Sequence, residues 1–189
     1  STAIDRFGVI NGLVNAAATS ARGSLTETTP ELFDQIFATN VRGPYFLIQE
    51  TIRLMIAKGI EDGICNIGSI SALAGQPFIN AYCASKGALT TLTANTAFSV
   101  MANRIRVNQL NVGWMASDHE REIQAADGDA DWEAKAAAAL PFGRLVDPAE
   151  AARAVNFLVS EDAGLMTGAI VNFDQSVWGG YAGQAPGPD

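Results

Sequence analysis

The chain has 189 residues, of which 48% are apolar and 17% are charged, so one globular domain is expected rather than a disordered chain. Its net charge of −8 argues against a nucleic-acid-binding protein, which normally carries a basic patch. The chain has no apolar run of the roughly 18 residues typical of a membrane-spanning helix and no recognisable secretory leader. We therefore expect no membrane partner and a cytoplasmic location.

Cysteine and histidine are too scarce to build several kinds of site. Of the two cysteines, Cys65 falls on a predicted strand and Cys83 on a predicted helix, which favours two reduced thiols over a disulfide framework. The single histidine, His119, excludes a histidine-based triad and a site with several histidine ligands. No metal site is predicted.

A short strand and a long helix are predicted in the first part of the chain. Residues 1–9 suit the end of a helix, and residues 10–17 form a short apolar strand. Residues 30–58 keep apolar side chains at helical spacing, with Thr29 suited to the N-cap and Gly59 to the end of the helix.

Pro44 lies inside that long helix. Because proline has no N–H, the carbonyl of Asn40, four residues earlier, loses its helical partner. Two interpretations stay open for this position. It is either a simple kink or a carbonyl freed to hold a water molecule.

Residues 63–87 carry the most distinctive chemistry. An apolar run ends at Ser69, as a buried parallel strand does at a functional edge of a sheet. The helix that follows, expected to reach about residue 103, places Tyr82 and Lys86 four residues apart and so on one face. A hydroxyl, a phenol and an ammonium group close together indicate proton-transfer chemistry.

The remaining elements complete an alternation of strands and helices. Strands are expected over residues 104–112 and 167–173. Between them, residues 114–146 are polar and rich in alanine, which fits a mobile lid, and residues 147–150 form a capping box that starts another helix. This alternation predicts a parallel sheet covered on both faces.

These motifs resemble the classical branch of the short-chain dehydrogenase/reductase (SDR) family over essentially the whole chain. A lone Tyr-x-x-x-Lys is common on helices by chance, whereas five motifs in the family's order are specific. In chain order they are residues 13–18 (LVNAAA), 39–41 (TNV), Ser69, residues 82–86 (YCASK), and residues 107–113 (VNQLNVG) followed by Ser117.

The resemblance implies an α/β fold with a Rossmann-like doubly wound parallel sheet. Residues 1–189 would be a single partial domain holding strands four to seven of the family fold. The implied activity is NAD(P)-dependent interconversion of a secondary alcohol and a carbonyl compound, with the polar lid suggesting a sugar or polyol. Tyr82 would be the acid and base, its pKa lowered by Lys86 and the cofactor, while Ser69 would hold the reacting oxygen and Asn40 a relay water.

By the same resemblance, residues at the end of the first strand, on the catalytic helix and after the 104–112 strand would bind NAD or NADP. They are Asn15, Ala16, Ala17, Tyr82, Lys86, Gly113, Met115 and Ser117. Two nearby positions depart from the family pattern, because Val112 replaces a proline and Ser117 replaces a threonine.

The family's glycine-rich phosphate-binding turn does not occur ahead of Asn15. About two βαβ units would be missing, which would leave the 10–17 strand as an apolar sheet edge. The chain is then expected to be part of a longer protein or to rely on partner chains. The residue that separates NAD from NADP would lie in the missing part, so that choice stays open.

Other functions stay open as well. A family member without the phosphate-binding turn could be an inactive oligomerising or regulatory subunit, and a hydrolase could use Ser69 as nucleophile with Lys86 as base. The resemblance also implies a homodimer or homotetramer, in which helices over residues 30–58 and 80–103 pair across a two-fold axis. The expected small-molecule partner is an alcohol or carbonyl substrate.

Overall fold

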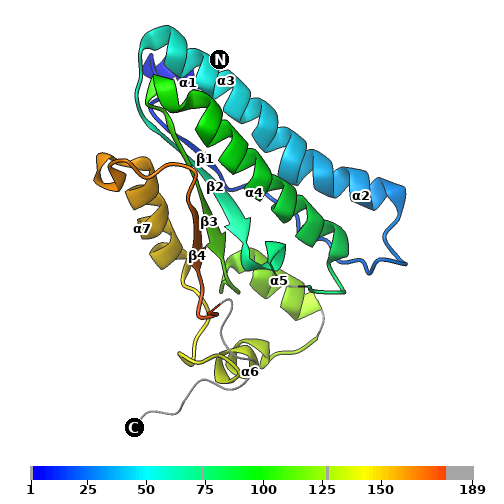
Figure 1. Cartoon of the computed structure of the whole chain (residues 1–189). Helices are drawn as coiled ribbons and strands as arrows, with labels where there is room; N and C mark the ends of the chain where they lie inside the picture. Colours follow the sequence, from blue (N-terminus) through cyan, green and yellow to red (C-terminus); the bar gives the residue numbers. More distant parts are fainter. Residues whose placement is uncertain (1, 74, 127, 178–189) are drawn as a thin grey trace.

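Four parallel strands form one sheet in sequence order, and helices cover both of its faces (Figure 1). The computed structural model describes residues 2–73, 75–126 and 128–177. The strands are β1 (Leu13–Asn15), β2 (Gly63–Ser69), β3 (Arg106–Val112) and β4 (Ile170–Phe173). The predicted α/β fold with a parallel sheet is confirmed.

The main helices are divided between the two faces of the sheet. Helices α3 (Gly43–Lys58) and α4 (Asn80–Val100) lie on one face, and α7 (Pro148–Val159) lies on the other (Figure 1). The shorter helices are α1 (Thr2–Phe7), α2 (Pro30–Phe37), α5 (Asp118–Ala126) and α6 (Trp132–Ala138). No helix in the described part of the chain is both long and apolar enough to cross a membrane.

Side chains alternate between two cores because successive residues of a strand point to opposite faces. On β2, Ile64 packs with Met55 and Val100 under α3 and α4, whereas Cys65 packs with Leu110 and Leu158 under α7. The central strands are thus buried on both sides, as in other covered parallel sheets. Both cysteines are free thiols, as predicted, with Cys65 fully buried.

Three strands are shorter than predicted. Strand β1 covers only Leu13–Asn15, because it bonds to β2 alone and its ladder ends where Asn15 meets Asn66. Strand β3 begins at Arg106, since Arg104 has a left-handed conformation (φ 56°) that turns the chain out of α4. Strand β4 begins at Ile170, after a turn in which Gly168 has φ 70°. Periodicity detects extended residues but not the pairing that ends a ladder.

The predicted helix over residues 30–58 is continuous but contains a π-helical segment, Ala38–Arg42. Its widened turn is closed by the N–H of Gly43, which donates to the carbonyl of Ala38 five residues earlier. Thr29 caps the start by accepting from Leu32 N, and Gly59 ends it with φ 64°. The disruption predicted from Pro44 is therefore a π-bulge, a feature frequently found at functional sites.

Residues 116–145 leave the sheet through a narrow neck. There Trp114 O accepts from Val146 N at 2.9 Å, and Ala116 N donates to Val146 O at 3.0 Å. Helices α5 and α6 lie in this excursion, near the ends of β2 and β3 (Figure 1). Trp132, Ala136 and Leu145 form a small core of their own there. The proposed lid segment is thus folded and pinned at its base.

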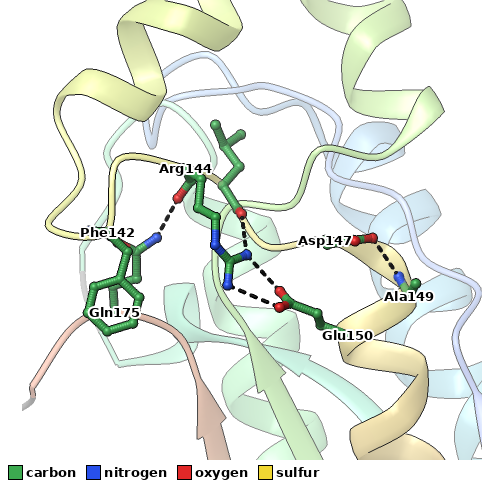
Figure 2. A network of polar contacts seen from close by, with 7 residues as sticks. Phe142, Arg144, Asp147, Ala149, Glu150 and Gln175 are labelled. Carbon is green, nitrogen blue, oxygen red and sulfur yellow. Dashed lines mark hydrogen bonds and ion pairs between the residues drawn. The ribbon is translucent and has the colours of Figure 1, made fainter.

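The start of α7 combines the predicted cap with an ion pair to the preceding loop (Figure 2). Asp147 caps the helix by accepting from Ala149 N at 2.8 Å, as expected. The carboxylate of Glu150 interacts with the backbone N–H of Asp147, as a capping box predicts, and is also held by both terminal nitrogens of Arg144 at 2.7 and 3.0 Å. Gln175 fixes the same loop, accepting from Phe142 N at 2.7 Å and donating to Arg144 O.

Candidate active site

The carboxyl ends of the strands bring the predicted residues to one edge of the sheet. Asn15 ends β1, and Ser69 at the end of β2 pairs with Val112 at the end of β3, next to Gly113. After β2, a 3-10 turn at Ile70–Ala72 leads toward the start of α4, so Tyr82 returns to the same edge within one helical turn. Ligand sites of open parallel sheets are expected at this edge.

Tyr82 is half-buried, and its phenol is in reach of Ser69 and Lys86. Burial raises the pKa of Tyr82, an interaction with the Ser69 hydroxyl lowers it, and the charges of Cys83 and Glu120 raise it further. The Lys86 Nζ lies 5.6 Å from the centroid of the tyrosine ring. The predicted fall in the Tyr82 pKa depends on a bound cofactor as well as on Lys86, and in the chain without cofactor desolvation dominates and the pKa is raised.

Lys86 is almost completely buried, with 3% of its surface exposed. Its Nζ donates a hydrogen bond of 2.8 Å to the carbonyl of Ile67 on β2, which fixes the ammonium group against the strand end. Burial lowers the pKa of Lys86 to about 8, because an ammonium ion loses hydration in the interior.

This pKa makes stability depend on pH. The folded chain releases the Lys86 proton near pH 8, while the unfolded chain holds it until about 10.5, so the unfolded state binds more protons in between. The contribution of Lys86 to the free energy of unfolding should therefore rise by up to about 1.4 kcal/mol per pH unit between these values. Below pH 8, Lys86 is protonated in both states, and the folded state then carries the full cost of burying its charge.

Urea denaturation at about pH 7.5 and about pH 8.5 measures this dependence, because above pH 9 the buried Cys65 thiol, with its pKa raised to about 11, opposes it. Tyr82, with a pKa raised above 10, does not titrate in this window. Lys86→Met should remove the rise, while Lys58→Met, at the exposed end of α3, should keep it. An equal rise in all three proteins would contradict the buried, cationic state of Lys86.

Ser69 is buried, and its hydroxyl belongs to a local network. It donates to Ser71 Oγ at 3.0 Å and accepts from Ser71 N at 3.1 Å, which caps the 3-10 turn. Within the described chain, no hydrogen bond joins Ser69 to Lys86. The Lys86 ammonium group instead donates a hydrogen bond to Ile67 O. The serine–lysine pair that a hydrolase of this type would need is therefore not formed.

Asn40 lies in the π-helical segment with only 1% of its surface exposed. Its amide exchanges two hydrogen bonds of 2.9 Å with the backbone of Thr19, and its Nδ2 donates to Ser85 Oγ at 3.0 Å. Ser85 in turn donates to the carbonyl of Tyr82 at 2.7 Å. The side chain of Asn40 thus ties the loop after β1 to the catalytic turn of α4.

The residues predicted to bind the adenosine side of a cofactor follow β1. Asn15 is buried, and its Nδ2 donates to Asn66 Oδ1 at 2.8 Å, so its side chain joins β1 to β2. Ala16 and Ala17 are exposed just beyond the strand end. Small, exposed residues leave the backbone of this edge open to a ligand.

The residues predicted for the nicotinamide side follow β3 and have structural roles as well. A Cβ on Gly113 would overlap the side chain of Asp174, so glycine allows the ends of β3 and β4 to approach. Met115 packs against the core beneath α7. Ser117 Oγ accepts from Glu120 N at 3.1 Å and caps α5.

A buried chain of polar side chains runs behind this edge and was not predicted. Gln109 Nε2 donates to Thr90 Oγ1 at 2.8 Å and to Asn111 Oδ1 at 2.7 Å. Thr90 Oγ1 donates to the carbonyl of Lys86 at 3.1 Å. Gln109 and Asn111 at alternate positions of β3 were the available signal, because residues two apart on a strand point to the same face and here both are polar on a buried strand.

Glu120 is a second residue that the sequence reasoning missed. It lies on α5, and its charge acts on the phenol of Tyr82. No group of histidine, cysteine and acidic residues able to hold a metal occurs in residues 2–73, 75–126 and 128–177.

A covered parallel sheet with serine, tyrosine and lysine at its carboxyl edge is typical of a Rossmann-like oxidoreductase. The family model described as "Enoyl-(Acyl carrier protein) reductase" matches residues 1–178. The chain therefore belongs to the short-chain dehydrogenase/reductase family of oxidoreductase enzymes.

Two relatives illustrate which members of the family this chain resembles. It is 36% identical over 169 residues to the "Inactive 2-(S)-hydroxypropyl-CoM dehydrogenase 2" of Xanthobacter autotrophicus, covering 89% of this chain and 73% of the relative. It is 30% identical over 181 residues to the sorbitol dehydrogenase of Cereibacter sphaeroides, covering 93% and 71%.

Solved structures agree with this placement. ElxO with bound NADP superposes with a TM-score of 0.83 at 27% identity, over 92% of this chain and 69% of that one. An NAD+-bound xylitol dehydrogenase superposes with a TM-score of 0.82 at 27% identity, over 93% and 72%. The chain thus spans about seven tenths of the length of these proteins.

Proposed function

We propose that this protein is an NAD(P)-dependent oxidoreductase that interconverts a secondary alcohol and a carbonyl compound of the sugar or polyol class. The observation that carries the proposal is the grouping of Ser69, Tyr82 and buried Lys86 at the carboxyl edge of the sheet. The relatives support the substrate class, since two of them are a sorbitol dehydrogenase and a galactitol 2-dehydrogenase.

In the proposed mechanism, Tyr82 exchanges the proton of the substrate oxygen and Ser69 donates a hydrogen bond to that oxygen. The raised pKa keeps Tyr82 protonated at neutral pH, the form that donates to a carbonyl oxygen during reduction. Lys86 supplies positive charge beside the phenol, and the π-bulge at Asn40 is proposed to hold the relay water. In oxidation Tyr82 would have to be the phenolate, a form favoured by Lys86 together with the positive charge of a bound oxidised cofactor, and the phenolate would accept the proton from the alcohol.

The residues at this edge fit a nicotinamide cofactor, either NAD or NADP. Ala16 and Ala17 would contact its adenosine side, and Gly113, Met115 and Ser117 its nicotinamide side, while Asn15 shapes the strand end. Tyr82 and Lys86 would contact its ribose. When bound, the cofactor supplies the hydride acceptor or donor. The exposed strand-end backbone and the absence of a bulky side chain at Ala16 and Ala17 support this fit.

A second candidate function is an inactive oligomerising or regulatory subunit, favoured by the word "inactive" in the name of one relative. Against it, burying a lysine costs free energy, and here the ammonium group is held at hydrogen-bond distance beside the tyrosine. A chain with no catalytic role would not need that arrangement. We therefore favour the enzyme.

The proposed assembly is a homodimer or homotetramer formed through α3 and α4. Exposed large apolar side chains on these helices support such an interface: Tyr45, Phe46, Leu47, Ile56 and Phe98. Sedimentation analysis at micromolar concentration tests it, and a monomer would contradict it.

The experiment for the proposed activity is reduction of NAD+ and of NADP+ by the protein with sorbitol, xylitol or galactitol, followed by the absorbance of the reduced nicotinamide. We expect turnover with one cofactor and at least one polyol. The same protein should catalyse the reverse reaction with the corresponding ketose. An absence of both reactions, with the cofactor bound in a direct titration, would favour the inactive subunit.

A further inference from the structure

Glu120 has an unusual position in the first turn of α5. The segment from Ser117 to Glu120 has the spacing of a capping box, and Ser117 Oγ accepts from Glu120 N at 3.1 Å. The reciprocal bond is missing, because Ser117 N donates to Met115 O at 2.9 Å instead. The carboxylate of Glu120 is therefore not used to cap its own helix.

The carboxylate is held by two donors on one of its oxygens. Trp114 Nε1 donates to Glu120 Oε1 at 3.0 Å, and Gln124 Nε2 donates to the same oxygen at 2.8 Å. The contacts of the described residues give Oε2 no hydrogen-bond partner. The group is thus oriented by protein contacts while one oxygen stays available to a ligand.

This carboxylate lies on the substrate side of the site. Trp114 comes two residues after Val112, which pairs with Ser69, so its backbone lies close to the strand end that carries Ser69. The negative charge of Glu120 is close enough to Tyr82 to act on its phenol. Trp114 also packs against Trp132 of α6, with 5.9 Å between the ring centroids, and this contact restricts the orientation of the indole.

We propose that Glu120 is the specificity-determining residue of the site and accepts a hydrogen bond from a second hydroxyl of a neutral polyol, with Trp114 lining the wall beside it. The inference rests on the proposed function and narrows its substrate. A carboxylate accepts hydroxyl hydrogen bonds strongly, whereas a carboxylate or sulfonate on the substrate would meet repulsion of like charges. Neutral polyols are thus selected over simple alcohols and over anionic hydroxy compounds.

The test compares four kinds of five-carbon substrate in the holoenzyme: xylitol, 2-pentanol, 4-hydroxypentanoate and 5-amino-2-pentanol. Glu120→Gln should lower kcat/KM for xylitol by about 10- to 100-fold, since it replaces a charged acceptor, and leave 2-pentanol nearly unchanged. Relative to 2-pentanol, 4-hydroxypentanoate should become a better substrate of the variant. Sorbitol and galactitol repeat the polyol comparison.

Two variants control for charge and folding. Glu122→Gln removes the same charge from the same helix at a side chain that is 78% exposed, and it should leave every ratio unchanged. Trp114→Phe removes the donor to Oε1 but keeps an aromatic side chain. It should therefore lower kcat/KM for polyols more than for 2-pentanol. Thermal melts establish that each variant is folded.

The outcomes separate the two proposals. If the wild-type enzyme oxidises 2-pentanol but Glu120→Gln leaves the ratio of xylitol to 2-pentanol unchanged, this inference is wrong and the proposed function stands. A wild-type preference for 5-amino-2-pentanol over all polyols would overturn the neutral substrate class. If no alcohol in the set is oxidised with either cofactor, both proposals fail.

Discussion

Tyr82→Phe is expected to lower kcat for alcohol oxidation by about 10³-fold or more, because the substrate oxygen loses its proton acceptor. The phenol is in reach of Ser69 and of the Lys86 ammonium, and no other titratable phenol shares this edge in the described part of the chain. Removing one hydroxyl from a half-buried ring should leave the fold intact. Steady-state rates with the proposed polyols measure the loss.

Tyr45→Phe is the matched control, since Tyr45 lies on α3 with 47% of its surface exposed. It should retain wild-type kcat. Binding of the reduced cofactor to Tyr82→Phe, followed by its fluorescence, should be nearly unchanged, which distinguishes a catalytic defect from a binding defect. Normal turnover by Tyr82→Phe would refute the proposed acid–base role.

Gly68→Ala is expected to destabilise the protein by roughly 3 kcal/mol, although it adds only one methyl group. A Cβ at this position would overlap the side-chain amides of Asn111 and Gln109, with Gln109 Cδ at 2.8 Å. Both amides are fully buried and hydrogen-bonded to each other. Moving either one breaks the contact that Gln109 makes with Thr90 of α4.

Urea denaturation of wild type and Gly68→Ala measures this difference in the free energy of unfolding. Gly87→Ala on α4 is the control, because nothing lies within 4 Å of its added Cβ and alanine favours a helix. It should be neutral or slightly stabilising. A wild-type midpoint for Gly68→Ala would show that Gln109 and Asn111 do not pack against β2 as described.

The elements that carry the proposed catalytic residues could be predicted from local sequence patterns. Thr29 and Gly59 act at the ends of the predicted helix, and the apolar run up to Ser69 is strand β2 in full. Tyr82 and Lys86 share a helix face because of their spacing alone. These features depend on contacts within a few residues, so an amino-acid sequence read in order is sufficient to predict them.

The tertiary structure decided what surrounds those residues. Asn40 bonds to Ser85, which is 45 residues away, and Arg144 binds the carboxylate of Glu150 in addition to the predicted cap. Neither contact can be predicted from residue spacing. Each group has several possible partners, and only folding brings the actual partner close.

Electrostatics were decided in the same way. The pattern around Tyr82 predicted a pKa lowered by Lys86 together with a bound cofactor, and in the chain without cofactor the pKa is raised because burial removes water from the phenol. The charge of Glu120 acts on the phenol of Tyr82 because α5 follows β3 and lies near the end of the sheet (Figure 1). The sequence by itself determined which groups carry the chemistry and on which elements they lie. Only the tertiary structure decided their desolvation and their long-range partners, since both depend on contacts between segments distant in the chain.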